Sequence, residues 1–155
     1  MNKKYVNKNN VCIKNRELNF KYSVIETIEC GIELKGTEVK SIRDGMCNLK
    51  DSFALVRDGQ VYLKNVHISP YEMGNINNVE PARDRKLLLH KSEIYKILGY
   101  IKQNGYALVP SKMYITRRWV KVQLAVCVGK KLYDKRQSLK EKDAKKQINE
   151  FKKNA

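Results

Sequence analysis

The feature that most constrains the fold is a period-two run of valine and leucine, with polar residues between them at its start, just before a lysine-rich end. Segment 120–128 reads VKVQLAVCV, and every second residue in it is valine or leucine. Because successive side chains of a strand point to opposite faces, this period of two predicts a strand with one face in the core. The alternation stops at Gly129, so we expect a folded domain over residues 11–128 and a different kind of segment over 129–155.

Positive charge is concentrated at the two ends of the chain. The 155 residues carry a formal net charge of +16, and segment 129–155 holds ten lysines and arginines against four acidic residues. A general compositional bias toward lysine would make the whole chain basic but does not explain this uneven distribution. Basic arms of this kind favour binding to a polyanion such as nucleic acid. We predict that residues 1–10 form a disordered basic N-terminal arm and that 129–155 is a flexible basic C-terminal tail.

Strand patterns dominate the middle of the chain. In segment 20–34, period-two spacing predicts one strand with a bulge near Glu26, its shared face formed by Phe20, Tyr22, Val24, Ile28 and Cys30. Two β-rich runs flank Asp58-Gly59, a pair typical of a type I′ hairpin turn. Segments 106–110 and 113–116 are predicted as two further strands, and Arg117 and Arg118 as the turn before the last strand.

Two segments have helical spacing instead. A short helix is predicted at about 38–44, capped by Thr37 and closed by Gly45. In segment 90–105, with Ser92 as cap and Gly105 as end, an amphipathic helix follows from apolar residues at i, i+3, i+4 and i+7: Ile94, Ile97, Leu98 and Ile101. Segment 69–84 is rich in turn residues and is predicted as a long loop.

These elements together predict a mainly β fold. About six short strands with two or three inserted helices fit a small antiparallel barrel of the OB-like kind, because closure removes exposed sheet edges. Such barrels often bind single-stranded or irregular nucleic acid.

Catalytic and metal-binding patterns are missing from the sequence. The two histidines have no metal-ligand spacing, no phosphate-binding glycine loop occurs, and the four cysteines form no C-x-x-C pair. We therefore expect no enzyme activity, no metal and no cofactor, and we interpret Cys30 and Cys127 as buried reduced thiols. Acids next to bases, as in "DRK" at 84–86, indicate solvated charge pairs or phosphate contacts. No apolar run is long enough for a membrane span and no signal peptide is evident, which predicts a cytoplasmic protein.

Four sequence blocks, in order and with similar spacing, resemble the SmpB family of SsrA-binding proteins. They are "GTEVKSIR" (36–43), "HISPYE" (67–72), "PARDRKLLLHKSEI" (81–94) and "GKKLYDKR" (129–136). The resemblance implies an OB-fold barrel that binds the tRNA-like domain of tmRNA (SsrA RNA) and delivers it to stalled ribosomes for trans-translation.

The resemblance also implies two sets of binding residues. The set that faces tmRNA consists of Asn15, Tyr22, Glu29, Leu88 and Lys121. The set that faces the ribosome lies in the tail and consists of Lys130, Lys131, Tyr133, Asp134, Lys135 and Arg136. Among the nine tyrosines, most fit ordinary strand positions, but Tyr133 lies in no alternating pattern and favours base stacking.

Further partners follow from the same resemblance. They are the ribosome, through 16S rRNA, the decoding centre and the empty mRNA channel, and indirectly elongation factor Tu with alanyl-tmRNA. We expect a monomer whose tail folds only on the ribosome. Two alternatives remain open at this point: a general OB-fold RNA chaperone or ribosome-associated RNA-binding protein, and a nuclease, which would need converging acids or histidines.

Overall fold

The computed structural model describes residues 11–102, 106–117 and 119–130, with only the backbone described at 75–77. The strands are β1 (Cys12–Lys14), β2 (Tyr22–Ile32), β3 (Cys47–Asn48), β4 (Phe53–Arg57), β5 (Gln60–Lys64), β6 (His67–Ile68), β7 (Arg85–Leu88), β8 (Tyr106–Thr116) and β9 (Trp119–Gly129). The helices are α1 (Leu18–Lys21), α2 (Gly36–Arg43), α3 (Lys91–Ile101) and a 3₁₀ helix, Glu72–Asn77.

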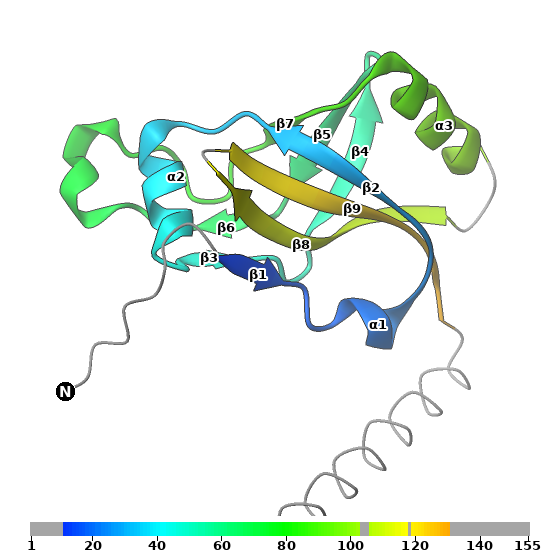
Figure 1. The fold of residues 1–155 in the computed structure, drawn as a ribbon, viewed down its shortest axis with the longest axis horizontal. Helices are drawn as coiled ribbons and strands as arrows, with labels where there is room; N and C mark the ends of the chain where they lie inside the picture. Colours follow the sequence, from blue (N-terminus) through cyan, green and yellow to red (C-terminus); the bar gives the residue numbers. More distant parts are fainter. Residues whose placement is uncertain (1–10, 103–105, 118, 131–155) are drawn as a thin grey trace, which may run out of the picture.

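Six strands close into an antiparallel barrel. The hydrogen-bonded order is β8-β4-β5-β7-β2-β9, and β9 pairs again with β8 to complete the ring. Strand β1 pairs with the far half of β8, and β3 and β6 form a separate two-stranded sheet. Figure 1 shows α2 at one end of the barrel and α3 at the other. The predicted mainly β barrel of about six strands is confirmed.

Alternation along the long strands separates a core from an outer face. The inward residues of β9, Val122, Leu124 and Val126, have no exposed surface. They pack with Ile28 and Cys30 of β2 in a single apolar cluster. Each inward residue is followed by one on the outside, so this strand pattern also defines an outer face of the barrel.

Several local predictions are confirmed by the backbone. Asp58 and Gly59 both have positive φ, 51° and 73°, as a type I′ hairpin requires. Gly45 ends α2 with a φ of 74° and donates its N–H to the carbonyl of Ile42. In α3, Ile97 is fully buried and Ile94 and Leu98 are half-buried, as the amphipathic spacing predicts, but Ile101, the last residue of the helix, is 42% exposed, so the predicted buried face was wrong at its end. The thiols of Cys30 and Cys127 are free and buried, and burial raises their pKa values to about 12 and about 11.

The long strand β2 differs from its prediction in which residues share a face. The bulge lies between Val24 and Glu26, as predicted. Because the bulge adds one residue, it reverses the alternation: Val24 pairs with Cys127 on the outer face, whereas Ile28 pairs with the buried Leu124. The single predicted face was therefore wrong, and Phe20 lies in α1 rather than in the strand.

Other differences concern element boundaries. The two strands predicted at 106–110 and 113–116 are one strand, β8, with a second register shift between Pro110 and Lys112. The helices begin after Lys35 and His90 rather than after the predicted caps Thr37 and Ser92, because the Glu38 and Glu93 carboxylates reach back to those backbone N–H groups. The predicted loop contains the 3₁₀ helix Glu72–Asn77. Gly105 and Arg118 lie outside the described residues.

The interpretation of the "DRK" block as a solvated charge pair holds for Asp84, which pairs with Lys64 at 3.4 Å, but was wrong for Arg85. Arg85 is 1% exposed, and its guanidinium donates to the Glu38 carboxylate at 2.6 Å and to the carbonyl of Val66 at 2.7 Å. Arg83 donates to the same carboxylate. Burial disfavours the Glu38 charge, but the hydrogen bonds from Arg83, the Lys35 N–H and Arg85 prevail and hold the pKa of Glu38 below its ordinary 4.5. This buried ion cluster fastens α2 to the barrel.

Candidate nucleic-acid interface

Strand register collects predicted residues from distant parts of the chain into one row on the outer face. Leu88 of β7 pairs with Gly31 of β2, Gly31 pairs with Lys121 of β9, and Lys121 pairs with Tyr114 of β8. Directly paired residues of antiparallel strands lie on the same side of a sheet. Leu88 and Lys121, predicted from separate blocks, therefore lie on one face with only Gly31 between them.

Leu88 lies directly over Gly31. A Cβ atom added to Gly31 would approach the Leu88 Cβ at 3.2 Å, closer than a relaxed contact allows. Leu88 keeps 47% of its surface exposed. Because position 31 has no side chain, the Leu88 side chain can pack directly against the backbone of β2.

A second row on the same face carries Glu29. Glu29 pairs with Gln123, Gln123 pairs with Lys112, and Lys112 pairs with Lys14 of β1. The Lys112 ammonium lies 5.3 Å from the centre of the Tyr114 ring in the first row. Three lysines therefore lie on the same face as Glu29: Lys14 and Lys112 in its own row, and Lys121 in the first row.

The carboxylate of Glu29 has a partner within the face. Burial raises the pKa of the Tyr114 hydroxyl to about 12, and a hydrogen bond with Glu29 adds to this shift. A tyrosine hydroxyl is protonated at neutral pH, so it is the group that can donate toward the Glu29 carboxylate. The Tyr114 ring in turn has the Lys112 ammonium over it. The acid therefore lies beside a tyrosine and a lysine of the same face.

Asn15 joins this face at the end of β1. Its backbone N–H donates to the carbonyl of Ser111 at 2.8 Å, and its side-chain amide donates to the carbonyl of Pro110 at 3.0 Å. The Ser111 hydroxyl in turn donates to the Gln123 side chain at 2.8 Å. Asn15 is therefore tied to the bulge of β8 and, through Ser111, to the row that contains Glu29.

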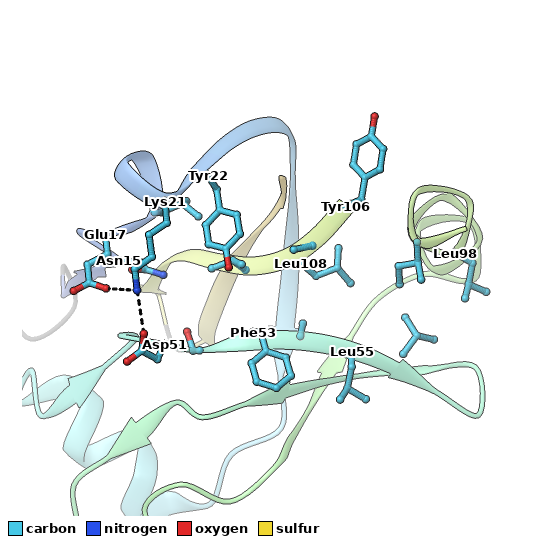
Figure 2. Close-up of a pocket in the computed structure, with 17 residues that line it drawn as sticks. Asn15, Glu17, Lys21, Tyr22, Asp51, Phe53, Leu55, Leu98, Tyr106 and Leu108 are labelled. Carbon is cyan, nitrogen blue, oxygen red and sulfur yellow. Dashed lines mark hydrogen bonds and ion pairs between the residues drawn. The ribbon is translucent and has the colours of Figure 1, made fainter. Parts of the chain in front are cut away.

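Tyr22 lies at a different place, in an apolar groove with a volume of about 610 Å³. Figure 2 shows its ring directed into this groove, opposite Phe53 of β4, with Asn15 at one end. Lys21 bridges Glu17 and Asp51 beside them at 2.9 Å and 3.1 Å. Asn15 therefore connects the groove to the outer face, whereas Tyr22 is separated from Glu29, Leu88 and Lys121.

Of the predicted tail residues, the structure describes only Lys130. Its N–H donates to the carbonyl of Lys21 at 2.9 Å, and its ammonium donates to the carbonyl of Asn19 at 2.6 Å. The start of the tail is thereby held against α1. The other tail residues lie outside the described residues: Lys131, Tyr133, Asp134, Lys135 and Arg136.

Sequence reasoning missed Tyr114, Lys112 and Lys14 as members of this face. The alternation of 120–128 places Gln123 beside Lys121 on the outward side of the strand but gives it no role. The other three depend on pairing between β1, β8 and β9, and the bulge at Ser111 changes which residues of β8 face outward. The pattern of a single strand does not contain this information.

The outer face can bind an anion but offers no catalytic arrangement. Its lysines can contact phosphates, and its amide and carboxylate groups can accept or donate to base edges. Within the described residues, no group of three or more histidine, cysteine, aspartate or glutamate side chains could hold a metal ion. In the same part of the chain, no helix has the length and apolar character needed to cross a membrane.

Comparison with known proteins identifies the family of this chain. The family model "SmpB protein" matches residues 12–154. An SsrA-binding protein from Clostridium acetobutylicum is 58% identical over 94% of both chains. Another from Caldicellulosiruptor bescii is 60% identical over 89% of this chain and 87% of the relative.

A solved structure has the same fold. It is described as "tmRNA-SmpB: a journey to the center of the bacterial ribosome", and its similar chain has a TM-score of 0.69 and 45% sequence identity. The match covers 83% of this chain and 94% of that one. With a family model that spans nearly the whole chain and relatives of this identity, this protein belongs to the SmpB family.

Proposed function

We propose that this protein binds the tRNA-like domain of tmRNA and delivers it to stalled ribosomes for trans-translation. The observation that carries the proposal is the outer face, where Glu29, Tyr114 and Lys112 form one connected group beside Lys121. Family membership supplies the identity of the RNA. The function is one of binding, without catalysis, and it belongs to the cytoplasm, where ribosomes translate.

The face is suited to a folded RNA because it combines charge with fixed polar groups. Lysines supply attraction to any phosphate backbone, which by itself has no sequence or shape preference. Glu29 and Gln123 are held by hydrogen bonds within the face, so they can recognise particular base or ribose groups. A general RNA chaperone needs the first property only.

Competition binding tests this distinction. Fluorescently labelled tRNA-like domain would be titrated with the full chain, and unlabelled tRNA or the same unlabelled domain would then be added as competitor. We expect the tRNA-like domain to compete at least about tenfold better, which corresponds to ~1.4 kcal/mol. Equal competition would contradict the proposal and support the general chaperone.

The tail is proposed to act on the ribosome, in the decoding centre and empty mRNA channel, rather than on tmRNA. Removal of 131–155 leaves Lys130 with its contacts to α1. This truncation should retain tmRNA binding and abolish tagging of a nonstop message in a reconstituted translation system. Loss of both activities together would show that the two parts do not work separately.

Within the tail, we propose that Lys131, Lys135 and Arg136 contact rRNA phosphates and that Tyr133 stacks on an exposed base. Asp134 would orient a neighbouring cation. The Tyr133→Ala, Asp134→Ala double variant should then lose tagging while it keeps tmRNA affinity. Full tagging activity of this double variant would mean that the tail acts only as a nonspecific basic arm. We further propose that the protein acts as a monomer and meets elongation factor Tu only through alanyl-tmRNA.

A further inference from the structure

Trp119, the only tryptophan of the sequence, lies exposed at the start of β9. Its side chain is 70% exposed. Tryptophan usually buries most of its surface, since its ring is among the largest apolar groups available to a fold. An indole left this open needs an explanation other than packing against the residues that the structure describes.

The position of Trp119 continues the outer face described above. It precedes Lys121 by two residues on β9, so both side chains lie on the same side of the strand, with backbones roughly 7 Å apart. Trp119 pairs with Thr116, and Lys121 pairs with Tyr114. The indole therefore lies beside the row that runs from Leu88 to Tyr114.

The surroundings of Trp119 are polar and cationic. Arg117 lies two residues before it, with a φ of 56° in the left-handed region, and is exposed at the end of the β8–β9 hairpin. Thr116 and Lys121 are strand neighbours of Trp119 on the outer face. The exposed Leu88 lies at the far end of the adjacent row, with Gly31 and Lys121 between them. A flat indole near cations suits a nucleotide, which has a stacking base and a phosphate.

We infer that Trp119 is a stacking site for an unpaired base of the RNA that binds the outer face, with Arg117 and Lys121 at the flanking phosphates. This inference rests on the proposed function and extends it. The nucleotide at the end of the β8–β9 hairpin would be unpaired, such as one in a loop or bulge. A base inside a helix is stacked on its neighbours, so its ring is not accessible to an indole.

Fluorescence of the full, unmodified chain tests the inference directly, because its tryptophan emission comes from position 119 alone. The protein would be titrated with the tRNA-like domain, and anisotropy of an end-labelled copy of the same RNA would report binding independently. We expect emission to fall in step with binding, and acrylamide to quench the bound indole less than the free one.

The two signals separate failure of this inference from failure of the proposed function. Binding by anisotropy with unchanged emission and unchanged acrylamide quenching would overturn the stacking site and leave the proposed function intact. If no binding appears by anisotropy, the proposed function fails and the inference fails with it.

Variants provide a second readout, with Tyr95 as the matched control. Tyr95 is 73% exposed but lies on α3, at the other end of the barrel from the β8–β9 hairpin (Figure 1). Trp119→Ala should weaken RNA binding about tenfold with an unchanged salt dependence, since stacking releases no counterions. Trp119→Phe should recover most of the affinity, and Tyr95→Ala should bind as the parent does. Equal affinities for Trp119→Ala and the parent, or for the Phe and Ala variants, would overturn the inference.

Discussion

Two groups of charged residues in this protein have similar composition and opposite roles. The buried ion cluster joins Glu38 to Arg83 and Arg85, and the outer face joins Glu29 to Tyr114 beside Lys112 and Lys121. Each contains one glutamate among several cations. The Glu38 and Arg85 side chains are only 4% and 0% exposed, whereas Glu29 is an exposed residue.

The difference shows that burial decides whether a group of charges stabilises the fold or stays available to a ligand. In the buried ion cluster, the carboxylate and both guanidinium groups satisfy one another and nearby carbonyls, so little remains for a ligand. On the outer face, the carboxylate holds one tyrosine while the lysines remain accessible. Charged groups of similar composition therefore contribute to architecture in one place and to the proposed binding face in the other.

The largest expected effect comes from the buried ion cluster. Glu38→Gln keeps the size of the side chain but removes its charge, which leaves the fully buried Arg85 without a counterion. Breaking a buried pair in this way should lower the free energy of unfolding by about 3–5 kcal/mol. Urea unfolding followed by circular dichroism measures it.

The matched control is the same substitution on the outer face. Glu29→Gln should leave the urea midpoint nearly unchanged, because an exposed residue contributes little to stability. If the two variants lost similar stability, the comparison between the two groups would be wrong.

Lowering the pH should destabilise the parent protein, in part as the Glu38→Gln substitution does, because it protonates the same carboxylate. Its folded pKa lies below the ordinary 4.5, so between these values the native state binds fewer protons than the unfolded state. The stability from this group is therefore present above its unfolded pKa and is lost as pH falls through the folded one. Urea midpoints measured from about pH 6 downward should fall more steeply in the parent than in Glu38→Gln. Parallel curves would rule out Glu38 as the titrating group.

On the outer face, Glu29→Arg should weaken tmRNA binding although it adds positive charge. Arginine cannot accept the Tyr114 hydroxyl, so the tyrosine and the lysine over its ring lose their fixed arrangement. We expect about a tenfold loss of affinity, or ~1.4 kcal/mol, typical of one charge-assisted hydrogen bond. Gel-shift titration at fixed salt measures it, and unchanged or tighter binding would show that only net charge matters here.

Tyr114→Phe sharpens this prediction. It removes the hydroxyl and keeps the ring, so its effect should overlap with that of Glu29→Gln. In a double-mutant cycle on binding, the two substitutions together should cost less than the sum of each alone. Additive effects would mean that Glu29 contacts the RNA independently of Tyr114.

The smallest expected effect concerns single lysines. Lys121→Ala should lower affinity only a few-fold and reduce the slope of log affinity against log salt by about one, as the loss of one phosphate contact does. Lys91→Ala, an exposed lysine at the start of α3, is the control and should leave the slope unchanged. A reduced slope in both variants would mean that the RNA contacts the lysine on α3 as well as the one on the outer face.

Local pattern was sufficient where a residue's own chemistry controls the backbone. Asp58-Gly59 predicts its hairpin turn because both positions tolerate positive φ, and the alternation of 120–128 predicts a half-buried strand. The bulge near Glu26 could also be placed, because a charged residue interrupts the apolar period. The family resemblance put Glu29, Leu88 and Lys121 into one predicted set without a physical account of why they belong together, and strand register brings all three to one face of the barrel.

Only the tertiary structure decided which residues share a surface and which charges are buried. Register between β2, β7, β8 and β9 brings Leu88 and Tyr114 into one row, and a single-residue shift at a bulge reverses every side chain beyond it. Arg85 is buried because Glu38, far away in the sequence, neutralises it inside the fold. The sequence by itself determined the hairpin turn at 58–59, the strand at 120–128 and the basic ends, since these depend on near neighbours. The division between architecture and binding face depends on contacts across strands, which no segment encodes alone.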